Sequence, residues 1–215
     1  MQQANLLIRQ RIERDVNVLE YWGENPTVQQ SLRPVARHVI DLLTRAEELA
    51  QSRAETLGNQ LTGPDDPRGN TWEQLTALAN SAAYTRCMVM YALALALPAG
   101  SEERVDTAMQ AIDYLKQFDN PTSGVQPTVR GRIAKLQMVR GALTLAQDTF
   151  ATIIAPPPEM RPEPDWNQRF EARYFSALCD LFLGQFADTR QKLDLYRSVG
   201  TLGPGGLVAL ESGEE

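Results

Sequence analysis

Apolar residues recur at helical spacing along almost the whole chain. In residues 4–22 they return every three or four positions, at Ile8, Ile12, Val16, Leu19 and Trp22. This spacing predicts an amphipathic helix. A second stripe predicts a long helix that begins at Thr27 or Ser31 and ends near Gly58. Together the two segments predict an N-terminal helical hairpin over residues 1–61.

Residues 81–97 form the most apolar stretch, and Arg86 is its only charge. The uncharged part, from Cys87 to Leu97, is too short for a membrane span, which needs about 20 residues. A helix that is apolar on all sides is typical of the centre of a helical bundle. We expect this helix to start at Thr71, with Gln74 completing a capping box. The preceding residues 61–70 contain two prolines and two glycines and predict a linker.

Further amphipathic stretches complete an all-α prediction. The expected helices cover residues 101–118, 128–140, 143–154, 165–184 and 186–196. Ser101 and Asp165 are the expected N-caps of two of them, and Gln168 lies three residues after Asp165, as a capping box requires. Five prolines in residues 155–164 predict an extended loop. Residues 200–215 are expected to form a flexible acidic tail, and no stretch has a strand pattern.

Composition and charge narrow the class of protein. The chain has 215 residues, 43% of them hydrophobic, and a net charge of −6, which argues against nucleic-acid binding. Cys87 and Cys179, the two cysteines, lie in apolar helical patterns and are expected to be buried and reduced. The N-terminus lacks the apolar segment of a signal peptide, so we expect a cytoplasmic protein. An exported protein whose signal has been removed is the alternative.

No catalytic or cofactor-binding motif is present in the sequence. There is no zinc spacing, phosphate loop, dinucleotide fingerprint or nucleophile motif, and the chain has one histidine. Paired carboxylates such as Glu102-Glu103 lie at helix starts, on exposed faces or in the linker, where a solvated role is expected. We therefore expect no cofactor, no metal and no enzymatic activity. An all-α enzyme or small-molecule binder with scattered site residues remains the alternative.

Residue spacing recurs in three segments, two of which begin at a glycine in a predicted turn. Gly141 is followed by Leu143, Ala146, Phe150, Ile153 and Pro158; Gly184 by Phe186, Thr189, Leu193 and Tyr196; and Glu103 by Val105, Ala108, Ile112, Leu115 and Pro121. This pattern resembles the tetratricopeptide repeat, in which a small residue lets two antiparallel helices touch and a glycine permits the turn. The small residues Ala108, Ala146 and Thr189 are 38 and 43 residues apart, whereas that family repeats every 34 or so. Arg130 and Arg173 stand where the family has a tryptophan.

The resemblance, over residues 72–198, implies an array of antiparallel helical hairpins wound into a right-handed α-α superhelix. Three helix pairs would cover residues 71–199 and continue from the hairpin at 1–61. In such arrays the first helix of each pair lines a concave groove, which would hold Arg132, Lys135, Arg173 and Tyr174. A basic groove with an aromatic residue suits an acidic peptide or a chain-terminal carboxylate.

We therefore expect a protein–protein interaction scaffold or adaptor whose groove binds a protein or peptide. For the basic residues the other interpretation is that they are solvated or pair with the acidic side chains before them, Asp106, Asp113 and Asp119. For the whole chain the other interpretation is a structural or oligomerising subunit that self-associates through Leu19 and Trp22. We expect neither a nucleic-acid partner nor a membrane span.

Overall fold

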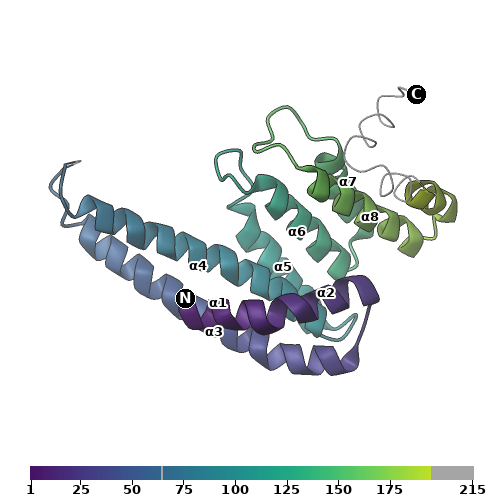
Figure 1. Ribbon diagram of the computed structural model, residues 1–215, viewed down its shortest axis with the longest axis horizontal. Coiled ribbons are helices and arrows are strands. Elements are labelled where there is room, and N and C mark those ends of the chain that lie inside the picture. The colour runs from purple at the N-terminus through teal and green to yellow at the C-terminus, as the bar shows by residue number, and fades with distance from the viewer. Residues whose placement is uncertain (64, 195–215) are drawn as a thin grey trace. The chain divides into compact units, whose positions relative to one another are not determined.

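The computed structural model describes residues 1–63 and 65–194, and these residues form helices and connecting loops without any strand (Figure 1). The all-α prediction is therefore confirmed for this part of the chain. The expected tail at 200–215 and the end of the last predicted helix lie outside it. The chain divides into two compact units, residues 1–114 and the residues from 115 onward, and each is described by itself.

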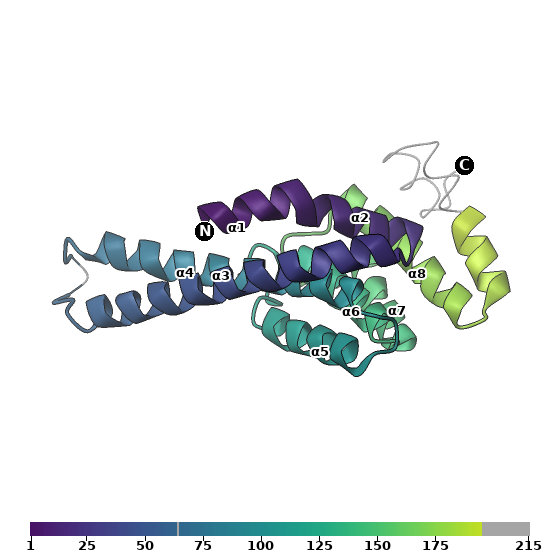
Figure 2. The ribbon, with the colours of Figure 1, turned by 90° about the horizontal axis from the view of Figure 1, so that it is seen from below.

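Unit 1 contains a long antiparallel hairpin and a third helical segment that lies against it. The segment comprises α1 (Gln2–Leu7), the π-helical η1 (Ile8–Ile12) and α2 (Glu13–Trp22). The hairpin consists of α3 (Pro26–Gly58) and α4 (Gly69–Ala96), and α5 (Glu102–Lys116) follows. Figures 1 and 2 show the α1–α2 segment running beside the hairpin, with the N-terminus partway along it. The π turn was not predicted from the apolar spacing.

The apolar stretch in α4 is the centre of unit 1, as the sequence predicts. Every residue from Val89 to Leu97 is buried. The last carbonyl groups of an α-helix have no partner within the helix. Here Gln29 Nε2 donates to the Leu95 carbonyl at 3.1 Å, Arg33 Nε to the Ala96 carbonyl at 2.7 Å, and Arg104 to the Leu97 carbonyl at 3.2 Å. Two of the three donors are cations, which the negative end of the helix dipole favours.

The starts of α3 and α4 differ from the prediction. Asn25, rather than Thr27 or Ser31, caps α3: its side-chain oxygen accepts from the Val28 N–H at 3.1 Å, and Pro26 occupies the first helical position. Pro34 lies inside the helix, on its exposed side. The capping box expected at Thr71 is wrong, because α4 already begins at Gly69 and has no side-chain cap.

The predicted linker, residues 61–70, lies between α3 and α4 of unit 1, and its described residues are held by local hydrogen bonds. The Asp66 carboxylate accepts from the backbone N–H and the hydroxyl of Thr62, both at 3.0 Å, and from Arg68. Arg68 also donates to the Gln60 carbonyl at 2.6 Å. The loop therefore joins α3 directly to α4, which pack along each other, and the division between compact units falls near the end of α5.

Unit 2 contains α6 (Gln126–Val139), α7 (Leu143–Ile154), α8 (Trp166–Phe182) and a further helix over residues 186–194. Helix α7 contacts both α6 and α8. The core that these three helices share consists of Ala134, Ala146, Phe150, Ile153, Ala172, Phe175 and Cys179. The predicted bounds of α7 are confirmed, as is the capping box in which Asp165 and Gln168 cap α8.

The two turns of unit 2 have the same backbone geometry. Gly141 and Gly184 adopt φ values of 83° and 76°, which only glycine adopts without strain. The same pair of hydrogen bonds closes each turn: Gly141 N–H to Met138 and Ala142 N–H to Gln137 in the first, Gly184 N–H to Leu181 and Gln185 N–H to Asp180 in the second. The bonds of the second turn involve residues 43 positions after those of the first.

The same offset relates side-chain contacts across each helix pair. The Thr149 hydroxyl of α7 donates to the Gln137 side chain of α6 at 2.9 Å. At the positions 43 residues later, Lys192 Nζ lies 2.6 Å from the Asp180 carboxylate of α8. The small residues Ala146 and Thr189 are also both buried. The helix pairs α6–α7 and α8–(186–194) therefore share the same turn hydrogen bonds and a cross-pair polar contact at matching positions.

Candidate functional site

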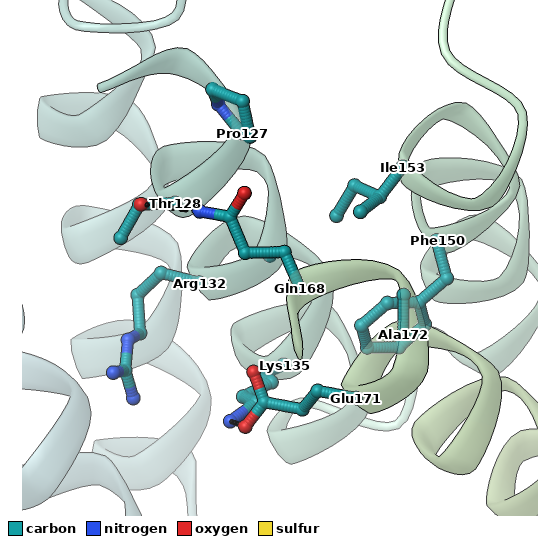
Figure 3. Close-up of a pocket in the computed structure, with 10 residues that line it drawn as sticks. Pro127, Thr128, Arg132, Lys135, Phe150, Ile153, Gln168, Glu171 and Ala172 are labelled. Carbon is teal, nitrogen blue, oxygen red and sulfur yellow. Dashed lines mark hydrogen bonds and ion pairs between the residues drawn. The ribbon is translucent and has the colours of Figure 1, made fainter. Parts of the chain in front are cut away.

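A small pocket lies between the three core helices of unit 2 (Figure 3). Its volume is about 80 Å³. Helix α6 contributes Thr128, Arg132 and Lys135 to its polar side, and α8 contributes Gln168 and Glu171. Its apolar side includes Phe150 and Ile153 from α7. The pocket therefore combines charged and amide groups with an apolar wall.

Lys135 is the most buried charged group of the pocket, at 5% exposure. Its ammonium nitrogen lies 2.7 Å from Glu171 Oε1 and 4.4 Å from the centre of the Phe175 ring. The carboxylate accepts a charge-assisted hydrogen bond, and the ring face makes a cation–π contact with the ammonium. Because one partner is in α6 and the others are in α8, these contacts also fix the spacing of the two helices.

Gln168 fixes the rim of the pocket. Its amide nitrogen donates to the Thr128 hydroxyl of α6 at 3.0 Å. Its amide oxygen accepts from the Asp165 N–H at 2.9 Å within the capping box of α8. A helix-capping residue therefore also connects the start of α8 to α6.

Gly131 leaves room in the pocket wall. It lies inside α6, where glycine costs about 0.5–1 kcal/mol relative to alanine. A Cβ atom built there would lie 3.7 Å from Ile153 Cδ1, an ordinary contact distance. Packing alone therefore does not require a glycine, and a side chain at this position would occupy part of the pocket.

The four predicted groove residues separate into two groups. Arg132 and Lys135 line the pocket, whereas Arg173 and Tyr174 do not. Arg173 is buried and donates to the Arg169 carbonyl at 3.3 Å; burial, and then the nearby Arg169 cation, lower the pKa of its guanidinium. The Tyr174 ring packs edge-on against Phe175, with ring centres 5.2 Å apart.

Glu171 and Gln168 were missed as pocket residues. Gln168 carries a local signal, but that signal identifies it as a helix cap. Glu171 is 36 positions from Lys135, its ion-pair partner, so no local pattern connects them.

Arg130 pairs with an acidic residue that precedes it in the sequence, which was the alternative interpretation of the basic residues. Its Nε donates to Asp119 Oδ1 at 2.8 Å, and Gln126 donates to the same oxygen at 3.0 Å. This cluster fastens the loop before α6 to the helix itself. Within α6, basic side chains therefore have separate roles: Arg130 holds the loop, and Lys135 faces α8.

The two cysteines are buried thiols, as expected. Burial raises the pKa of Cys87 to about 11 and that of Cys179 to about 12. Since the thiolate is the nucleophile and the metal ligand, both are unreactive at neutral pH. In the described part of the chain no group of His, Cys, Asp and Glu could hold a metal ion. None of the helices described here is long and apolar enough to cross a membrane.

Leu19, which was expected at a self-association surface, is buried inside unit 1 at 6% exposure. The side chain of Trp22 lies outside the described part of the structure. In unit 1 a second pocket, of about 440 Å³, is lined by Met1, Leu49, Leu75 and Leu78 among others. Leu49 and Leu78 are both exposed there.

Comparison with known proteins found no family model, no curated protein and no solved structure that matches this chain.

Proposed function

We propose that the protein is an interaction scaffold or adaptor, and that the α6–α8 pocket binds an acidic peptide segment or a chain-terminal carboxylate of a partner protein. One observation carries the proposal: Arg132 and Lys135 lie together in a pocket that also has an apolar wall. Peptide recognition requires both an anion-binding group and a place for an aliphatic group.

The size of the pocket supports a peptide group over a cofactor. Sites for drug-sized ligands and cofactors occupy about 300–1,000 Å³. A pocket of about 80 Å³ accommodates a carboxylate or a small aliphatic side chain. Arg132 and Lys135 place two basic side chains in its lining, beside the carboxylate of Glu171.

The repeated arrangement of unit 2 supports the hairpin-array interpretation. Helices α6 and α8 are the first helices of equivalent pairs, and the pocket lies between them. In the proposed α-α superhelix, first helices line the ligand-binding surface. The resemblance to tetratricopeptide repeats therefore remains a proposal about the fold, supported by the 43-residue offset within unit 2.

The proposal is tested with the full chain and fluorescent peptide pairs that differ only in a terminal carboxylate or carboxamide. Internally acidic peptides form a second set. We expect anisotropy titrations to identify acidic or carboxylate-ending peptides that bind, and Arg132→Gln to weaken them about tenfold, as for a lost charge-assisted hydrogen bond. Arg9→Gln, at an exposed arginine of unit 1, is the matched control. Equal binding of every peptide by wild type and Arg132→Gln would exclude this pocket as the site.

The alternative, a structural or oligomerising subunit, is supported by the second pocket. Leu49 and Leu78 are 55% and 39% exposed beside an apolar groove of unit 1. Association of two copies through this groove would remove both side chains from water. The alternative predicts a mass in sedimentation that rises with concentration and that Leu49→Glu returns to one chain. A single-chain mass at all concentrations excludes it.

A further inference from the structure

We propose that the outer face of helix 186–194 is a docking site for an amphipathic helix of a partner protein, and that this helix carries a carboxylate facing Arg190. The site is separate from the α6–α8 pocket. The inference rests on the equivalence of the two helix pairs in unit 2 and on the exposed apolar side chains at the end of the second pair.

Helix α7 shows how the second helix of a pair receives the next helix. Gln147 of α7 donates its amide N–H to the Asp180 carboxylate of α8. The Phe150 ring stacks on Phe175 of α8, with ring centres 6.1 Å apart. Leu143 packs against the same core. Positions 143, 147 and 150 lie on one side of a helix, so this side of α7 is the surface that binds α8.

The same surface of the last described helix consists of Phe186, Arg190 and Leu193, each 43 residues further along. All three are exposed, Phe186 at 69% and Leu193 at 37%. Phe182, at the end of α8, adds a second aromatic side chain at 65% exposure. These exposed aromatic and aliphatic side chains are typical of an interface.

Arg190 defines the charge of the partner. It replaces Gln147, whose own partner in α8 is a carboxylate, so an acidic residue at the equivalent place would form a charge-assisted hydrogen bond. Within the helix Arg190 lies 3.9 Å from Asp194, an exposed pair at i and i+4 that contributes little. An acidic group on a docked helix would therefore compete readily for the guanidinium.

Helix α8 supplies the pattern of the expected partner. It meets α7 with a small residue, an aromatic residue three positions later, a second small residue and then an acid, at Ala172, Phe175, Cys179 and Asp180. We expect the docked helix to have similar spacing. A second copy of this chain buries the same residues of its own α8 inside unit 2, so the pattern indicates a different protein.

The test uses the full chain and a labelled synthetic peptide with the sequence of residues 165–183, in which Cys179→Ala prevents oxidation. We expect saturable binding in anisotropy titrations. Phe186→Ser should weaken it at least about tenfold. Leu145→Ser, at an exposed apolar position of α7, should leave it unchanged. Unchanged melting temperatures of both variants show that folding is intact, because both side chains are exposed.

A charge exchange distinguishes this surface from the native α8 position. Arg190→Glu should weaken binding about tenfold, and the Asp180→Arg peptide should restore it. Absent binding, or binding insensitive to Phe186→Ser and Arg190→Glu, would overturn the proposal. Two other results would also overturn it: wild-type dimerisation that Phe186→Ser abolishes, which assigns the face to a second copy, or binding only after removal of residues 195–215, which assigns it to the chain itself.

Discussion

The ammonium of Lys192 lies 2.6 Å from the carboxylate of Asp180, in the place where Thr149 meets Gln137 in the preceding helix pair. Both contacts connect the first helix of a pair to the second, across a glycine turn with the same hydrogen bonds. A polar contact therefore occupies the same position in both helix pairs, and it is neutral in the first pair and ionic in the second.

Exchanging one contact for the other tests the equivalence of the pairs. Asp180→Gln or Lys192→Thr alone should lower the free energy of unfolding by about 1–3 kcal/mol, because each removes one member of an ion pair whose carboxylate is buried. The double variant recreates the Gln–Thr contact and should recover most of the loss. Urea unfolding measures all four proteins. Strictly additive losses would show that the pairs are not equivalent.

Ala146→Leu tests the close contact of the helices in unit 2. Ala146 is fully buried in the shared core, so three additional carbon atoms should cost about 1–3 kcal/mol of unfolding free energy. Ala151→Leu on the exposed side of the same helix should change it by less than about 0.5 kcal/mol. Similar effects of the two changes would contradict the assigned helix face.

The buried thiols predict a loss of stability at alkaline pH. Folding raises the thiol pKa from an ordinary value of 9.0 to about 11 for Cys87 and about 12 for Cys179. Above pH 9 the unfolded chain releases protons that the folded chain retains, so unfolding becomes easier by about 1 kcal/mol per pH unit for each thiol. Unfolding at pH 8 and pH 10 measures the loss, which should be smaller in Cys87→Ala. Identical pH dependence would refute the pKa shift of Cys87.

From the lowered pKa of the Asp66 carboxyl group we expect a loss of stability at acidic pH. Its hydrogen bonds with Arg68, first through the side chain and then through the backbone, and with Thr62 lower the pKa of its carboxyl far below 3.8. The carboxylate therefore stabilises the folded state above pH 4, and the contribution disappears as the pH falls below that value. Asp66→Asn should lower the melting temperature at pH 7 and reduce its dependence on pH below 4. Asp65→Asn, at an exposed neighbour, is the matched control.

Local signals predicted most helices of the described chain. The bounds of α7 follow from its apolar stripe and from Gly141 and Pro156 at its ends, and the cap of α8 follows from Asp165 and Gln168 alone. The prediction for the start of α4 was wrong for a physical reason. Asp66 organises the preceding loop through contacts that residue types do not reveal, and the helix begins earlier than Thr71.

The candidate site was less predictable than the fold. Arg132 and Lys135 follow from their positions on a basic helix. Whether Arg173 and Tyr174 line the pocket depends on the rotation of α8 about its axis. The packing of Phe175 against α7 determines that rotation. Glu171 reaches Lys135 only because two helices separated by α7 in sequence lie side by side.

The most direct test of the proposed function compares peptide affinity in wild type and Gly131→Ala. The added methyl group occupies the pocket wall beside Ile153 without a clash. We predict that the acidic or carboxylate-ending peptides bind the variant at least about tenfold more weakly, while its free energy of unfolding rises by about 0.5–1 kcal/mol, since alanine replaces glycine in a helix. Affinity that is unchanged in this more stable variant would contradict the assignment of the pocket as the peptide site.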